Sequence, residues 1–438
     1  MKNSHKLLTE KPWKLILSMS IPSMFAMLST AIGSIVGSFF IARDISALSA
    51  AYPIQALMTA FAIAVGIGSG SALSRAIGQG DEALTKRTAA GGTALILGTL
   101  LPVTALGIAA AFLLPAVFDL NAEEVDGAKI YLIIISAAFP MTAVHTVFNR
   151  IAVSEGVTVP PMIAAISGTA VTVAIDFLLF NVETPLSGMA KLGVADAVGQ
   201  GVTLIAALII AKRLPITPFI DKRYLPDKKV FAEIIKVSLP SAVQNGIDAM
   251  FSTALNAILG GAAIAFYGAF YKVRQQALTP IYGLNQGTVP ILGAAFGNGD
   301  KARFKKVFVI SSSIALGIAA AVTIAAECSA DKLLNLFDIT EEVNYFRILA
   351  GGFVPAAAAL MISAAFVATG QGGKAMALNL LRGAGIGIPA ALILRNLPTG
   401  YTWIALAAAE FVAVAIFIPI AVKSYKNTPL KAGQKKQK

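Results

Sequence analysis

Long runs of apolar residues, separated by short polar connections, recur from the start of the chain almost to its end. A bilayer core takes about 20 apolar residues as a helix. The chain has twelve such runs, at 14–42, 46–76, 89–118, 129–153, 160–181, 187–211, 234–258, 264–296, 307–328, 344–370, 374–396 and 401–423. This pattern predicts an all-α integral membrane protein with about twelve transmembrane helices.

The composition supports a membrane protein and excludes several other classes. Of 438 residues, 56% are hydrophobic and 13% are charged, against about 25% charged in soluble domains. A soluble enzyme, a disordered chain and a disulfide-stapled domain are therefore excluded. The one cysteine, Cys328, allows no intrachain disulfide and no cysteine-based zinc site. No nucleotide-binding, metalloprotease or nucleophile–base motif is present, so we expect no enzymatic activity and no cofactor.

The net charge of +12 is unevenly distributed along the chain. Basic residues gather at both ends and on alternating connections, namely Lys2, Lys6, Lys11, Lys14, Lys86, Arg87, Lys212, Arg213, Lys222, Arg223, Lys228, Lys229, Lys301, Arg303, Lys305, Lys306 and the lysines from Lys423 to Lys438. Connections on the other side are short or acidic. Because Lys and Arg stay on the cytoplasmic side, both termini should be cytoplasmic. The basic start shows no signal-peptide cleavage site, and no nucleic-acid partner needs to be invoked.

The sequence contains an internal repeat. Ile21-Pro22-Ser23 returns as Leu239-Pro240-Ser241, and Gly78-Gln79-Gly80-Asp81 returns as Gly297-Asn298-Gly299-Asp300. Six predicted spans separate the copies, so both halves enter the membrane in the same direction, which is a parallel repeat. We predict an N-lobe at 1–211 with helices 1–6, a cytoplasmic linker at 212–232, and a C-lobe at 233–438 with helices 7–12 and a basic tail. Two such lobes should hold a binding cavity between them near the bilayer midplane.

Carboxylates inside the predicted spans are the strongest candidates for function. Span five holds Asp176, with Thr172 one turn before it, and span six holds Asp196. Asp248 lies in a polar stripe of span seven. A charge at membrane depth costs about 2.5–3.5 kcal/mol on insertion scales, so it has a reason to be there. We interpret Asp176, Asp196, Thr172 and Asp248 as binding a coupling ion or proton, with sodium at Asp176 or Asp248 as one form of the site. The alternative is a helix-to-helix hydrogen bond or a structural ion pair.

Span eight carries an unusual group of cationic and amide side chains. Three roles are open for Lys272 and Arg274: they neutralise Asp248, contact an anionic part of a substrate, or extend to an interface. We favour the interpretation that they form a structural ion pair within the protein. Residues considered for a substrate cavity are Asn245, Gln286, Tyr282, Gln276 and Arg274. Arg382 and Glu410 are weaker intramembrane candidates, and His145 is interpreted as a helix contact.

Taken together, these motifs resemble the multidrug and toxic compound extrusion (MATE) family, bacterial type, over nearly the whole chain. The resemblance rests on Ser20-Ile21-Pro22-Ser23, the Gly-Gln-Gly-Asp connection at 78–81, Ile175-Asp176-Phe177, Gly199-Gln200, Ser238-Leu239-Pro240-Ser241, the Pro-Ile-Tyr-Gly-Leu-Asn-Gln-Gly segment at 280–287, and Phe296-Gly297-Asn298-Gly299-Asp300. It implies two six-helix lobes that form a V-shaped cleft. It also implies export of amphipathic, often cationic compounds in exchange for sodium ions or protons, in the bacterial inner membrane.

The resemblance breaks down at informative positions. The family commonly has a span-one carboxylate, where this chain has Gly37, while Asp196 stands in span six where relatives often have threonine. We hypothesise that the acid has been relocated within one N-lobe site, which requires that the three helices meet. Asp248 falls near a span-seven acid of sodium-coupled members, but the span-ten acid of those members has no counterpart in Ala356–Ala368.

The sequence thus predicts a monomeric, ion-driven efflux antiporter that works by alternating access, with small amphipathic or cationic molecules as substrates. One alternative is a lipid-linked saccharide flippase of the same superfamily, which would need a strongly cationic cavity for pyrophosphate. The other is a membrane binding protein that transports nothing.

Overall fold

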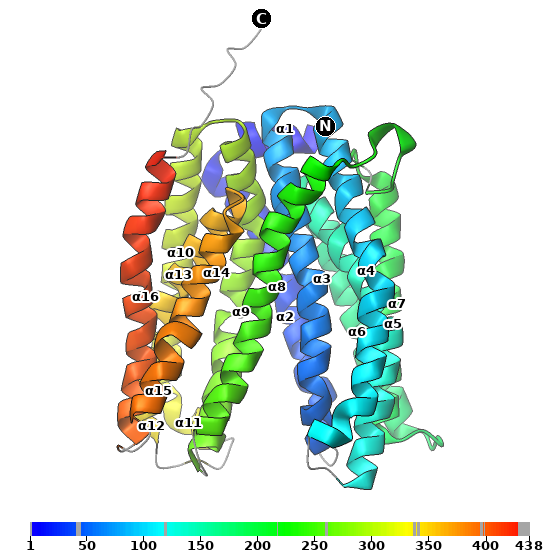
Figure 1. Cartoon of the computed structure of the whole chain (residues 1–438), viewed down its shortest axis with the longest axis vertical. Coiled ribbons are helices and arrows are strands. Elements are labelled where there is room, and N and C mark those ends of the chain that lie inside the picture. The colour runs from blue at the N-terminus through cyan, green and yellow to red at the C-terminus, as the bar shows by residue number, and fades with distance from the viewer. Residues whose placement is uncertain are drawn as a thin grey trace, which may run out of the picture.

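The computed structural model describes residues 2–40, 45–117, 121–216, 218–258, 262–335, 339, 342–394, 397 and 399–427. These residues are helical apart from short connections (Figure 1). The helices are α1 Lys2–Thr9, α2 Pro12–Phe40, α3 Ile45–Gln79, α4 Glu82–Val117, α5 Ala122–Ser154, α6 Val159–Asn181, α7 Gly188–Arg213, η1 Lys222–Tyr224, α8 Lys228–Ile258, α9 Ala262–Gly297, α10 Lys301–Cys328, α11 Ala330–Asn335, α12 Val343–Ala350, α13 Phe353–Ala368, α14 Gly372–Leu380, η2 Leu381–Gly387, α15 Ile388–Leu394 and α16 Thr399–Asn427. The fold class is the predicted one.

Ten segments within the described residues are long and apolar enough to cross a membrane. They match ten of the twelve predicted spans. The other two predicted spans, 234–258 and 264–296, correspond to α8 and α9, which are 31 and 36 residues long. The tenth predicted span is divided at Gly351 and Gly352 into α12 and α13, and the eleventh contains the π-helical segment η2 between α14 and α15. Large apolar side chains on the outer surface, such as Leu101 at 82% exposed, suit contact with lipid.

Each copy of the repeated Gly-x-Gly-Asp motif ends one helix and begins the next. Gly80 and Gly299 follow α3 and α9 with φ of 72° and 74°, a left-handed conformation that favours glycine. The next residue caps the following helix, because Asp81 Oδ1 accepts from the Leu84 N–H at 2.9 Å and Asp300 Oδ1 accepts from the Arg303 N–H at 2.8 Å. The repeat found in the sequence is therefore a repeated helix–turn–helix geometry.

The two lobes touch through glycines at the end of the molecule where α2 and α8 begin and α3 and α9 end, here called the basic end (top in Figure 1). A Cβ on Gly78 would lie 2.1 Å from the Ala294 carbonyl oxygen, and one on Gly297 would lie 2.1 Å from the Arg75 carbonyl oxygen. Only glycine allows backbones to approach so closely.

A second pair of glycines lies deeper along the same two helices. A Cβ on Gly68 of α3 would lie 2.0 Å from Ser238 Oγ, and one on Gly287 of α9 would lie 2.7 Å from Ser20 Oγ. The four glycines, Gly68, Gly78, Gly287 and Gly297, form what we call the glycine seam. Its contacts are related by the repeat of the sequence, so the two halves meet through equivalent residues. The lobe boundaries at 1–211, 212–232 and 233–438 stay a prediction.

Candidate functional site

Asp176 lies buried in α6, in the N-lobe. Its side chain is 0% exposed, and neither carboxylate oxygen has a hydrogen-bond partner among the described residues. A Cβ on Gly37 of α2 would lie 3.8 Å from Asp176 Oδ2 and 3.4 Å from Leu192 Cδ1 of α7. The helices of spans one, five and six therefore meet at this carboxylate, as the relocation hypothesis requires.

Asp196 lies in α7 and is half-buried. The Tyr131 hydroxyl, from α5, is 3.2 Å from Asp196 Oδ2 and 3.1 Å from Gln55 Oε1 of α3. The single hydroxyl proton can serve one of these acceptors at a time, so Tyr131 has two alternative partners. Asp196 and Asp176 are near enough that a charge on one repels a charge on the other. The N-lobe thus places two interacting carboxylates in one region.

Tyr131 and Gln55 were not among the residues predicted from the sequence. Gln55 is an uncharged polar residue within the otherwise apolar run 46–76, which was a usable signal. Tyr131 lies near the start of a span, where aromatic residues are common for other reasons, so its sequence position carried little information.

Thr172 contacts the neighbouring helix. A Cβ on Gly199 of α7 would lie 1.9 Å from Thr172 Oγ1, and one on Gly168 of α6 would lie 1.9 Å from Thr203 Oγ1. These reciprocal contacts bring α6 and α7 close together. Since Asp176 accepts no hydrogen bond among the described residues, Thr172 does not donate to it in this conformation.

A further polar contact joins α5 to α7 one turn beyond Asp196. His145 Nε2 lies 2.6 Å from Gln200 Oε1, and His145 Nδ1 is buried without a partner among the described residues. The sequence predicted a helix contact for His145, and the structure shows one.

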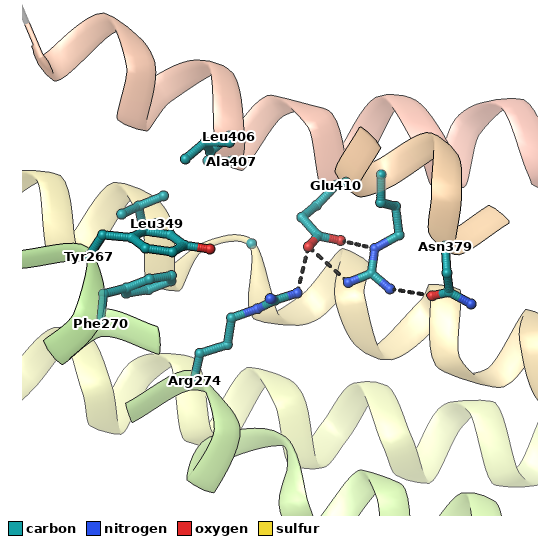
Figure 2. A pocket seen from close by; sticks show the side chains of 11 residues that line it. Tyr267, Phe270, Arg274, Leu349, Asn379, Leu406, Ala407 and Glu410 are labelled. Atoms are coloured by element: carbon teal, nitrogen blue, oxygen red, sulfur yellow. Dashed lines mark hydrogen bonds and ion pairs between the residues drawn. The ribbon is translucent and has the colours of Figure 1, made fainter. Parts of the chain in front are cut away.

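Arg274 of α9 belongs to a three-residue ion pair in the C-lobe (Figure 2). Its Nη2 lies 2.7 Å from Glu410 Oε1 of α16. Arg382 of η2 binds the same carboxylate with two nitrogens, Nε at 2.6 Å from Oε2 and Nη2 at 2.9 Å from Oε1. Structural pairing was the favoured prediction for Arg274, and its observed partner is Glu410.

The remaining C-lobe candidates are more scattered. The side chains of Asn245 and Asp248 lie outside the described residues, although their helix, α8, is described. Tyr282 lies near Arg274, Gln286 is half-buried, and Gln276 is exposed. The roles of these residues stay predictions.

Residues 16–178 and 238–393 match the MatE family model. The chain belongs to the MatE family. Among its relatives are the multidrug export proteins MepA of Staphylococcus haemolyticus, 25% identical over 437 residues with 94% of each chain covered, and of Staphylococcus aureus, 25% identical over 427 residues with 93% of each chain covered.

Solved structures show that this MatE family chain has the fold of known transporters. A multidrug resistance MATE transporter in an outward-facing conformation superimposes with a TM-score of 0.91 at 22% identity, covering 99% of both chains. A MOP superfamily transporter from Pyrococcus furiosus also gives a TM-score of 0.91 at 22% identity, covering 98% of this chain and 99% of that one. The family resemblance seen in the sequence is confirmed, and the chain is a multi-pass membrane protein.

Proposed function

We propose that this protein is a secondary active efflux transporter of the bacterial inner membrane, with both termini in the cytoplasm. It exports amphipathic or cationic organic compounds in exchange for protons or sodium ions by alternating access. Membership of the MatE family supports this proposal, as do the relatives that are called multidrug export proteins.

The observation that carries the proposal is the buried carboxylate of Asp176, which has no hydrogen-bond partner among the described residues. Burying a charge without a partner is costly, so a proton or a cation that binds there gains free energy. Asp196 lies near enough to Asp176 that charges on the two carboxylates repel each other. Binding of one cation or proton at this pair therefore relieves both the burial cost and the repulsion.

Alternating access requires that the ion bind one arrangement of the lobes more tightly than the other. The glycine seam closes the basic end in this structure, and opening that end would separate α3 from α9. The helix α2 contacts both α6, which carries Asp176, and α9 of the other lobe. Binding of an ion at Asp176 and Asp196 would therefore act through α2 on the stability of the contacts at the glycine seam.

The relocation hypothesis is tested by restoring the family's arrangement. Asp196→Asn should abolish gradient-driven export, and Gly37→Asp in that background should return a carboxylate to the same pocket, because position 37 faces Asp176. Gly37→Ala is the matched control, since a methyl group there makes only ordinary contacts. Unchanged coupling in Asp196→Asn would contradict the relocation.

Export itself is tested with the purified protein in liposomes that contain a fluorescent organic cation. A pH gradient and a sodium gradient are applied in turn. A proton-coupled site predicts flux that follows the pH gradient and survives sodium removal, while Asp176→Asn should lose this dependence. Asp126→Asn, at an exposed position early in α5, is the control. Flux that ignores both gradients would refute coupling.

A further inference from the structure

The C-lobe contains a small cavity beside the Arg274–Glu410–Arg382 cluster, and its two ends differ in character (Figure 2). Its volume is about 60 Å³, room for roughly four to six water molecules. Charged and amide side chains form one end. The other end is mainly aromatic and aliphatic and includes Tyr267, Phe270, Leu349, Leu406 and Ala407.

The two arginines at the polar end are satisfied to different degrees. Arg382 uses Nε and Nη2 on Glu410, and its Nη1 donates to Asn379 Oδ1 at 2.9 Å. Arg274 uses only Nη2 on Glu410, although a guanidinium has five N–H donors. Within the described residues, Arg274 therefore faces the cavity with most of its donors not used on a carboxylate.

Among the side chains that the structure describes, the cluster also carries an excess of positive charge. Two guanidiniums share one carboxylate, so the three side chains sum to +1, and they are only 13–21% exposed. Arg274 lies twelve residues into α9 and Glu410 eleven residues into α16, about 17–18 Å from the start of each helix. That depth is near the middle of a bilayer core, where an uncompensated charge is costly.

The backbone is irregular at the same place. Arg382 lies in the π-helical segment η2, and Gly383 of that segment lines the cavity. Single π-helical turns within α-helices occur frequently at functional sites. Asn379, near the end of α14, and Arg382, in η2, line the cavity from two consecutive elements.

We propose that this cavity binds the carboxylate group of a small organic acid. Arg274 would be the principal donor, and the aromatic and aliphatic end would hold the apolar part of the acid. Guanidinium groups bind carboxylates through paired hydrogen bonds. The excess positive charge favours an anion and disfavours a cation. The proposal goes beyond the proposed function and concerns binding only, so it stands or falls independently of cation export.

The protein contains its own reporter for this binding. The ring of Tyr267 stacks on Trp403, with centroids 6.2 Å apart and an interplanar angle of 2°, and Trp403 is fully buried. The only other tryptophan is Trp13. In a Trp13→Phe background, Trp403 fluorescence of the full chain in detergent should change saturably with benzoate. Benzyl alcohol and benzylamine, which lack the carboxylate, should have little effect.

Variants separate a binding site from a structural ion pair. Arg274→Gln should weaken benzoate binding by roughly tenfold to a hundredfold, the range for a hydrogen bond to a charged group. Lys272→Gln, at an exposed position on the same helix, should bind as the parent does. Glu410→Gln removes the competing carboxylate and should bind benzoate more tightly. If that variant does not fold, Arg274→Lys, which keeps the charge and loses the fork, should bind with intermediate affinity.

The proposal is overturned if benzoate produces no saturable change, if Arg274→Gln binds as the parent does, or if benzylamine competes as well as benzoate. Labelled benzoate in a liposome counterflow assay then identifies the source of the anion. Exchange across the membrane means that the acid is a transported substrate. Saturable binding without exchange means that it is a resident counter-ion of the C-lobe. Both results support the carboxylate site.

Discussion

Replacing Gly297 by alanine should open the basic end of the transporter. The added methyl group would lie 2.1 Å from the Arg75 carbonyl oxygen, about 1.3 Å short of the 3.4 Å at which ordinary contact begins. The methyl carbon is held in place by the α9 backbone and the carbonyl oxygen belongs to the α3 backbone, so neither atom can turn away, and α9 must move from α3. Overpacking of this kind costs about 1–3 kcal/mol. Because only the closed arrangement contains the contact, the population should shift by about 5–150-fold toward the open one.

Spin labels at Arg87 and Lys306 would report this movement. Both positions are exposed, and they are equivalent in the two copies of the repeat. With Cys328 replaced by serine, double electron–electron resonance should give one short distance between the two labels for the parent and an added longer distance for Gly297→Ala.

Two further substitutions complete the experiment. Gly78→Ala should behave like Gly297→Ala, because its methyl group would meet the equivalent carbonyl oxygen of Ala294 at the same 2.1 Å. Gly268→Ala is the control on α9, because a methyl group there would have no neighbour within 4 Å. A distance distribution in Gly297→Ala that matches both the control and the parent would refute the reasoning.

Three other predictions concern single side chains. Glu155 lies just beyond the span Ala122–Ser154, and burial raises its pKa to about 8. The stability that its protonated form contributes is therefore complete below pH 4.5 and is lost as the pH rises through 8. The Tm of the parent should fall from pH 5 to 9 more than that of Glu155→Gln. Glu233 pairs with Arg75 at 3.1 Å, and the two side chains are 55% and 8% exposed. Because glutamine keeps an oxygen that can accept from the buried guanidinium, Glu233→Gln should destabilise the closed arrangement by less than about 1 kcal/mol, below Gly297→Ala in the distance assay. Cys328 is exposed at the end of α10 opposite the basic end, and an impermeant maleimide should label it in intact cells.

Each of these predictions has a result that would contradict it. Parallel profiles of Tm against pH for the parent and Glu155→Gln would mean that ionisation of Glu155 does not cause the loss of stability. An effect of Glu233→Gln as large as that of the glycine substitution would make the ion pair, and not the backbone contact, the main closure. Labelling of Cys328 only after the cells are permeabilised would invert the proposed orientation.

The apolar pattern predicted the helices well because nearly every position of a membrane-spanning helix faces lipid or other helices and is therefore apolar. It missed the helix ends, as at α4, which begins at Glu82 while the predicted span begins at 89; polar residues continue a helix beyond the hydrocarbon. It also missed the break at Gly351 and the π-helical segment η2. Those irregularities depend on packing between helices, which a periodicity does not encode.

The candidate site could be predicted only in part. Asp176 and Asp196 were identified because a charge in a span needs a reason. The spacing of Thr172 placed it on the face of Asp176, but that part of the helix packs against the α7 backbone at Gly199. The partner of Arg274 is 136 residues away in the sequence, and no local pattern links such positions.

The glycine seam is an isologous interface within a single chain, as though two subunits of a dimer had been fused. In a homodimer, any substitution would appear on both sides of the contact at once. Fusion removes that constraint while the shared surface is kept. One half can then hold buried acids and the other a surplus of guanidinium groups, as Asp176 and Arg274 exemplify. The two halves can thus specialise for ligands of opposite charge while they still meet through equivalent glycine contacts.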